Sequence, residues 1–140
     1  MSRHQRDLFA DAVRVYKDLR AELPGAVPFW PLGLPRWDDS WIALGLRAPG
    51  TSYLTVWHRG PLAAASTRPG GRHPSREDAD PAEVTLPIPH LGGQRGQRGR
   101  PVTPRILYPA AGAGLSWDPG TSARTVSLPR KPSACVLSLA

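Results

Sequence analysis

The first residues of the chain alternate between apolar and polar side chains with the spacing of an α-helix. An apolar stripe recurs from Ser2 to Leu23 at intervals that place its members on one side of a helix. Its members are Leu8, Ala12, Val15, Tyr16, Leu19 and Leu23. Ser2 and Gln5 predict a capping box at the start, and Pro24-Gly25 predicts the end. Because the stripe is wider than one small sheet would cover, we expect the helix to pack on a larger body.

After residue 40 the apolar positions alternate with a period of two. Trp41–Ala48 and Tyr53–Arg59 are such runs, and Pro49-Gly50-Thr51-Ser52 between them predicts a hairpin. Further strand-like runs are Glu83–Ile88, Val102–Tyr108, Ala123–Leu128 and Ala134–Leu139, with a turn signal at Asp118-Pro119-Gly120. Since no helical pattern separates these runs, the sequence predicts a mainly β protein. We expect a small antiparallel β-sandwich preceded by one amphipathic α-helix.

The segment Pro28–Trp41 joins the two patterns and holds three tryptophans, Trp30, Trp37 and Trp41. Its prolines remove backbone donors and exclude both a helix and a central strand. Its aromatic side chains carry a large apolar surface. We therefore expect an irregular joint whose three indoles are buried between the helix and the sheet.

These patterns divide the chain into three parts. Residues 1–25 form the helix, residues 26–40 the Trp/Pro-rich connector, and residues 41–140 the sandwich. Two stretches, 61–81 and 92–101, are rich in Pro, Gly and Arg and offer little to bury, so we expect flexible loops there.

The formal net charge of +7 raises the question of nucleic-acid binding. Most of the excess falls in the stretches expected to be loops rather than along a helix or sheet face. Gly92–Arg100 repeats Gly-Gln-Arg, and Arg95, Arg98 and Arg100 would be the contacts of a basic Arg/Gly-loop module. We keep that module as an alternative function, although the charge distribution disfavours it.

Other features of the whole sequence limit the class of protein to which it can belong. No apolar run approaches the ~20 residues of a membrane span. The N-terminus has no apolar stretch after Met1, so the sequence predicts no secretory signal and a cytoplasmic location. The single cysteine, Cys135, excludes an internal disulfide, and its apolar neighbours predict a buried thiol.

Few residues are candidates for chemistry. The four histidines (His4, His58, His73 and His90) lack the spacing of metal ligands, so the sequence predicts no metal site, no cofactor and no catalytic residue. Asp38-Asp39 is an adjacent pair, whereas glycoside hydrolysis needs two carboxyl groups on opposite sides of the bond. We expect these carboxylates to satisfy loop N–H groups. The alternative is a carbohydrate contact formed by Trp37, Asp38, Asp39 and Trp41.

The order of several short motifs resembles a known family. Val15–Arg20 reads VYKDLR, Val27–Pro35 reads VPFWPLGLP, and Trp37–Arg47 reads WDDSWIALGLR. Later come YLTVW, ILYP, LSWD and LPRKPSACVLSL, the last ending at Leu139. This order resembles the C-terminal part of actinobacterial alpha-galactosidases of glycoside hydrolase family 36, the melibiase family. The resemblance covers nearly the whole chain except Pro61–Pro81 and Gly92–Arg100.

The resemblance implies a C-terminal β-domain of a carbohydrate-metabolism enzyme, preceded by the last helix of a (β/α)8 barrel. The family's catalytic residues lie in barrel segments that this sequence lacks. Trp37-Asp38-Asp39 differs from the family's Lys-Trp-Asp-x-Asn motif. In the family, the position of Met1 lies within a continuous polypeptide. The resemblance therefore predicts a mis-started or broken reading frame. We therefore expect a fragment that is inactive alone and whose partner is the missing barrel or, through the helix, another copy. The alternative is a stand-alone carbohydrate-binding sandwich.

Overall fold

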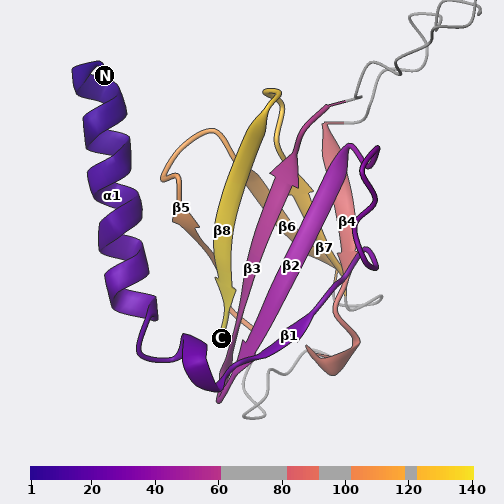
Figure 1. Cartoon of the computed structure of the whole chain (residues 1–140). Helices are drawn as coiled ribbons and strands as arrows, with labels where there is room; N and C mark the ends of the chain where they lie inside the picture. Colours follow the sequence, from indigo (N-terminus) through magenta and orange to yellow (C-terminus); the bar gives the residue numbers. More distant parts are fainter. Residues whose placement is uncertain (61–81, 92–101, 119–122) are drawn as a thin grey trace, which may run out of the picture.

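The computed structural model describes residues 1–60, 82–91, 102–118 and 123–140. Two antiparallel sheets pack face to face, and one helix stands beside them (Figure 1). The larger sheet has the order β1-β2-β3-β8-β5 and the smaller one the order β4-β7-β6. The strands are β1 (Val27–Phe29), β2 (Trp41–Ala48), β3 (Thr51–His58), β4 (Glu83–Pro87), β5 (Pro104–Tyr108), β6 (Gly114–Asp118), β7 (Ala123–Ser127) and β8 (Ser133–Leu139). The prediction of a mainly β sandwich preceded by a helix is confirmed.

The helix α1 spans Arg3–Leu19 and begins at the predicted capping box. The Ser2 hydroxyl accepts from Gln5 N at 3.2 Å, and Ser2 N donates to Gln5 Oε1 at 2.7 Å. The helix ends four residues before the predicted Leu23, and a short 3-10 helix, η1 (Leu23–Gly25), follows it. None of the helix residues is buried, and the expectation that the helix packs on a larger body stays a prediction.

The hairpin of β2 and β3 is tighter than the sequence predicts. Ala48 pairs with Thr51, which leaves Pro49 and Gly50 as the turn, with Gly50 at φ +84°. That conformation favours glycine because a Cβ would crowd the backbone. The other predicted strands all form, with ends that differ from the prediction by one or two residues. The predicted loops at 61–81 and 92–101 and part of the turn at Asp118-Pro119-Gly120 lie outside the described residues.

Two strands were not predicted. The strand β6 joins the smaller sheet by pairing with β7. The strand β1 lies inside the segment 26–40 that the sequence assigned to an irregular connector, and it pairs with Gly45–Arg47 of β2. Pro28 is compatible with β1 because β1 is an edge strand, where one missing donor costs no ladder bond. The connector is therefore partly a piece of the sandwich.

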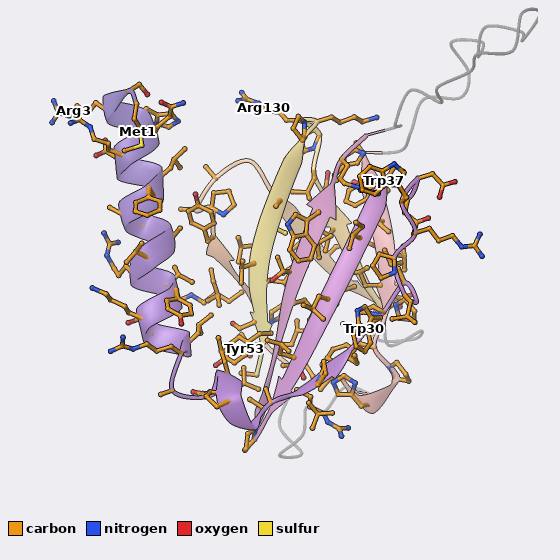
Figure 2. The ribbon with its side chains drawn as sticks, viewed as in Figure 1. Met1, Arg3, Trp30, Trp37, Tyr53 and Arg130 are labelled. Atoms are coloured by element: carbon orange, nitrogen blue, oxygen red, sulfur yellow. The ribbon has the colours of Figure 1, made fainter. Side chains whose placement is uncertain are left out.

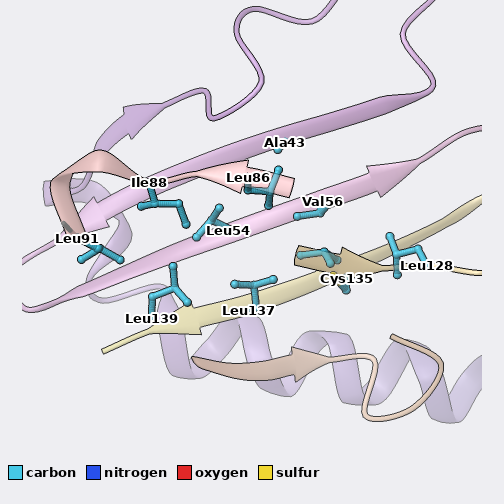
Figure 3. Close-up of a cluster of buried hydrophobic side chains, with 11 residues drawn as sticks. Ala43, Leu54, Val56, Leu86, Ile88, Leu91, Leu128, Cys135, Leu137 and Leu139 are labelled. Carbon is cyan, nitrogen blue, oxygen red and sulfur yellow. The ribbon is translucent and has the colours of Figure 1, made fainter. Parts of the chain in front are cut away.

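The core lies between the two sheets and is made of aliphatic side chains (Figure 3). The strands of the larger sheet contribute every second residue to it, as their alternation predicts. Its buried members are Ala43, Leu54, Val56, Leu86, Ile88, Leu91, Val126, Leu128, Cys135, Leu137 and Leu139. Cys135 is buried as predicted, and burial raises the pKa of its thiol to about 11.

The ring of Phe29 closes the β1 edge of this core by lying over Gly45, its cross-strand partner. A Cβ added to Gly45 would lie 2.2 Å from Phe29 Cζ. The same ring contacts His90 edge-on, with centroids 4.7 Å apart. Gly45 is therefore the residue that allows β1 to place an aromatic ring on the sheet.

We expect Gly45→Ala to lower the free energy of unfolding by about 1–3 kcal/mol, because the new methyl group must displace the Phe29 ring. Urea denaturation measures the change. Gly25→Ala is the matched control, since a Cβ there meets nothing within 4 Å, and it should change stability by less than about 0.5 kcal/mol. Equal stability of the two variants would contradict the assigned contact between Phe29 and Gly45.

Candidate functional site

The four residues predicted to contact carbohydrate do not form one site. The Trp37 side chain is 87% exposed, and Asp38 is also exposed. The carboxylate of Asp39 instead accepts a hydrogen bond from Arg36 N at 2.7 Å, so it closes the turn as the structural interpretation expected. Trp41 faces the core side and stacks on His58, with ring centroids 3.9 Å apart and an interplanar angle of 8°. Only Trp37 and Asp38 remain available to a ligand at the surface.

The prediction that three indoles are buried between the helix and the sheet is wrong. Figure 2 shows Trp30 and Trp37 along the β1 edge of the larger sheet, on the opposite side from α1. Trp30 is 41% exposed, and Trp41 alone packs against the core. The apolar surface of an aromatic side chain favours burial but does not require it, since folded proteins leave much apolar surface in contact with water.

The loop that carries Trp37 is held by Arg59, which follows β3. The Arg59 guanidinium donates to three backbone carbonyls, those of Arg36 (3.3 Å), Trp37 (2.9 Å) and Asp39. Its backbone N–H donates to Ser40 O at 2.8 Å. The planar guanidinium offers several N–H groups in fixed directions, so one side chain fixes the whole turn. No local pattern predicts this contact, because the hairpin of β2 and β3 alone brings residues 36–40 close to Arg59.

Ser52 and His90 form the one contact in the described chain that looks like a nucleophile and its base. Ser52 Oγ lies 3.0 Å from His90 Nε2. Burial, and then the positive charge of Arg47, lower the pKa of His90, so its ring is neutral near pH 7. However, Ser52 is completely buried, and a nucleophile must reach its substrate. The pair instead joins the short 3-10 helix η2 (Pro89–Leu91) to β3.

Two other polar side chains, His58 and Arg124, are also too deeply buried to reach a substrate, so their role is structural. His58 Nδ1 lies 2.8 Å from Leu128 O, and because a carbonyl only accepts, Nδ1 carries the proton. This bond connects the two sheets through the core. Arg124 is completely buried on β7, and burial lowers its pKa to about 10, which still leaves it charged at neutral pH. Neither group is exposed to solvent, so neither can bind an external ligand in this conformation.

A groove separates α1 from the sandwich. It has a volume of about 900 Å³ and is lined by Leu8 and Val15 of the helix and by Leu107 and Tyr108 of β5. Further lining comes from the segment that leads into β8, including Arg130 and Pro132. The stripe of α1 therefore faces β5 across the groove without being buried against it.

The segment that follows α1 is tied to the larger sheet by a side-chain hydrogen bond. The Tyr53 hydroxyl on β3 donates to Glu22 Oε2 at 2.9 Å. Burial, together with the hydrogen bond and the negative charge of Glu22, raises the Tyr53 pKa to about 12. The phenol thus stays protonated and able to donate throughout the physiological range. The chain is held to the sheet just after the helix, while the helix itself borders the groove from His4 to Val15.

The outer face of the larger sheet, turned away from the core, is also apolar. It is formed by the residues of β2, β3, β5 and β8 that alternate with the core positions. The apolar members of this outer face are Ile42, Leu44, Leu46, Ala48, Tyr53, Trp57, Tyr108, Ala134 and Val136, and its polar members include Thr51, Thr55, Arg105 and Ser138. All the apolar members except Ala48 and Tyr53 are only partly buried. In Figure 1 α1 lies beside this face at its β5 edge, and η1 lies near the end of β2.

The described residues contain no group of three or more His, Cys, Asp or Glu side chains that could hold a metal ion. His73 and the arginines of the nucleic-acid alternative, Arg95, Arg98 and Arg100, lie outside them. None of the helices in the described ranges is long and apolar enough to span a membrane.

Comparison of the chain with protein-family models, with curated proteins and with solved structures found no match. The resemblance to glycoside hydrolase family 36 therefore stays a prediction from the motifs, and the functional argument rests on the geometry described above.

Proposed function

We propose that this chain is a non-catalytic β-sandwich module that docks on a second protein body through α1 and the outer face of the larger sheet. That body would be the (β/α)8 barrel of an alpha-galactosidase-like glycoside hydrolase. The observation that carries the proposal is the outer face, on which apolar side chains, most of them only partly buried, outnumber the polar Thr51, Thr55, Arg105 and Ser138.

An antiparallel sheet with one face on a core usually presents polar residues to water on the other. Here Ile42, Leu44 and Leu46 follow one another along the outer side of β2, and Trp57 and Val136 continue the face on β3 and β8. Large apolar patches of this kind mark surfaces that contact another protein. The stripe of α1 extends the patch on the β5 side, because no residue of that helix is buried.

The arrangement of carboxylates supports a non-catalytic role. Hydrolysis of a glycosidic bond uses two carboxyl groups about 5 to 9 Å apart that flank the bond. Asp38 and Asp39 are neighbours in one turn, and Asp39 is already bonded to Arg36 N. The buried pair of Ser52 and His90 is likewise inaccessible to a substrate. The module would then contribute packing and stability to the enzyme rather than chemistry.

The identity of the partner rests on the motif order. In the family that the sequence resembles, a helix of the barrel leads through a connector into a C-terminal antiparallel β domain. The element order of this chain, a helix followed by a proline-rich segment and then a sandwich, agrees with that arrangement.

Co-expression tests the proposal. The tagged chain would be produced together with the catalytic barrel of an actinobacterial family 36 alpha-galactosidase that lacks its own C-terminal domain. We expect a one-to-one complex by size-exclusion chromatography with light scattering. The chain alone should not hydrolyse aryl alpha-galactosides, because Asp38 and Asp39 lie in one turn and cannot flank a glycosidic bond.

Two variants serve as controls. Leu44→Lys places a charge in the middle of the outer face and should abolish the complex without unfolding the sandwich, which circular dichroism checks. Ser116→Ala lies on the smaller sheet and should leave the complex intact. A barrel that fails to copurify with the wild-type chain, or that binds Leu44→Lys equally well, would contradict the proposal.

A further inference from the structure

The short 3-10 helix η2 covers one end of the sandwich core. Ile88, just before it, and Leu91, its last residue, are buried members of that core (Figure 3). Leu91 N donates to Ile88 O at 3.0 Å and closes the turn. His90 comes directly before Leu91 and is only partly buried, and its ring contacts the larger sheet. An imidazole ring therefore joins this end of the core to the sheet.

Three strands of the larger sheet surround the His90 ring. Ser52 of β3 is completely buried, and its Oγ lies 3.0 Å from His90 Nε2. The Phe29 ring of β1 meets the imidazole edge-on, with centroids 4.7 Å apart and an interplanar angle of 80°. Arg47 of β2 pairs with Ser52, and its guanidinium supplies the charge that acts on the imidazole. The imidazole thus lies among an uncharged hydroxyl, an aromatic ring and a cation.

These neighbours favour the neutral form of the imidazole. Burial, and then the charge of Arg47, lower the pKa of His90 from its ordinary value of 6.5. The Ser52 hydroxyl can both donate and accept, so it can bond to the neutral ring and to the charged ring alike. The hydrogen bond therefore does not offset the free energy of placing a second positive charge in this partly buried position. A protonated ring is more stable in water, where it is hydrated and lies farther from Arg47.

We propose that His90 is an acid-sensitive switch: when its ring binds a proton, η2 leaves Ser52 and Phe29 and opens this end of the core. The docked ring binds a proton more weakly than the same ring in water does. The docked state is therefore fully favoured above about pH 6.5 and loses stability as the pH falls below that value. The open state would expose the apolar side chains of Ile88 and Leu91. This switch belongs to the sandwich itself and does not depend on the partner proposed above.

Hydrogen exchange followed by NMR on the full chain tests the switch at about pH 7.5 and about pH 5.5. The Leu91 amide reports the opening of η2, and the Leu54 amide in the interior strand β3 reports global unfolding. After correction for intrinsic exchange rates, the protection factor of Leu91 should fall by about 3- to 10-fold at the lower pH. Leu91 should be less protected than Leu54 at both pH values. Its exchange should also be insensitive to low urea concentrations, because opening η2 exposes little surface.

Three variants separate the His90 proton from other causes. His90→Gln keeps a hydrogen-bonding side chain that cannot bind a proton, so the protection of Leu91 should become the same at both pH values. His4→Gln at the exposed start of α1 is the matched control and should keep the wild-type response. Arg47→Gln removes the charge but not the burial, so the pKa of His90, measured by NMR titration of its ring, should rise and remain below 6.5.

Three results would overturn the switch. The first is a full pH response of Leu91 in His90→Gln, which would assign the response to another group such as the buried His58. The second is equal, urea-sensitive protection of Leu91 and Leu54, which would show that η2 opens only when the whole sandwich unfolds. The third is a wild-type His90 ring that titrates at or above 6.5, a measurement that does not depend on whether any variant folds.

Discussion

Replacing Leu54 by alanine is expected to lower the free energy of unfolding by about 2–5 kcal/mol. Leu54 is completely buried in the middle of β3, between the two sheets, and pairs with Leu137 of β8 and Gly45 of β2. The variant loses the transfer free energy of the side chain and leaves a cavity that a rigid sheet cannot close. Chemical denaturation monitored by circular dichroism measures the loss.

Leu44→Ala is the matched control on the other side of the same sheet. Leu44 belongs to the outer face and is only partly buried, so we expect a loss of about 1 kcal/mol. The ratio of the two losses shows which face of the sheet is the core. If Leu44→Ala costs as much as Leu54→Ala, the outer face is already covered within this chain and is not a docking surface for a partner.

Deleting residues 1–20 is expected to convert a self-associating chain into a monomer. The stripe of α1 and the outer face together present more apolar surface than soluble monomers usually leave exposed. Removal of the helix eliminates one of the two surfaces, while Glu22 and its bond to Tyr53 are retained. Sedimentation velocity at several concentrations measures the change. The midpoint of thermal unfolding should shift little, because α1 contributes no buried residue to the core.

A pair of point substitutions isolates the stripe from the rest of the helix. Val15→Ser removes an apolar side chain that lines the groove and should reduce self-association. Lys17→Ser changes an exposed side chain of the same helix and should not. The opposite result would be a full-length chain that is a stable monomer and loses stability when the helix is deleted. It would show that α1 already packs stably against the sandwich within this chain.

Local patterns predicted most of the fold. The capping box at Ser2 and Gln5 marks the start of α1 because both partners lie within one helical turn. The alternation of Trp41–Ala48 gave the bounds of β2 because a strand with one face on a core needs every second residue to be apolar. The apolar neighbours of Cys135 predicted that its side chain is buried, as it is. In each case the information lies within a few neighbouring residues.

The candidate sites could not be predicted as well, because they depend on contacts between distant segments. Arg59 reaches the loop at residues 36–39 only after the hairpin of β2 and β3 has formed. Ser52 meets His90 through the packing of η2. The exposure of Trp37 was missed because the aromatic composition of its segment predicts burial. The loop lies at an edge of the sheet, and within the described chain Trp37 stays 87% exposed there. The strand β1 was missed because Pro28 excludes a central strand but not an edge strand.

The position of β8 determines when this protein can fold during its synthesis. It is the last strand of the described chain, yet it lies in the interior of the larger sheet, between β3 and β5. Before residues 133–139 emerge from the ribosome, β3 has no second neighbour and β5 has no neighbour in the larger sheet at all. The hairpin of β2 and β3, apolar on both faces, is therefore exposed while the remaining chain is translated, and pairing across so long a separation is slow. Aggregation of the nascent chain competes with folding during this interval, so the yield of folded protein should depend on how rapidly the C-terminal strand is delivered.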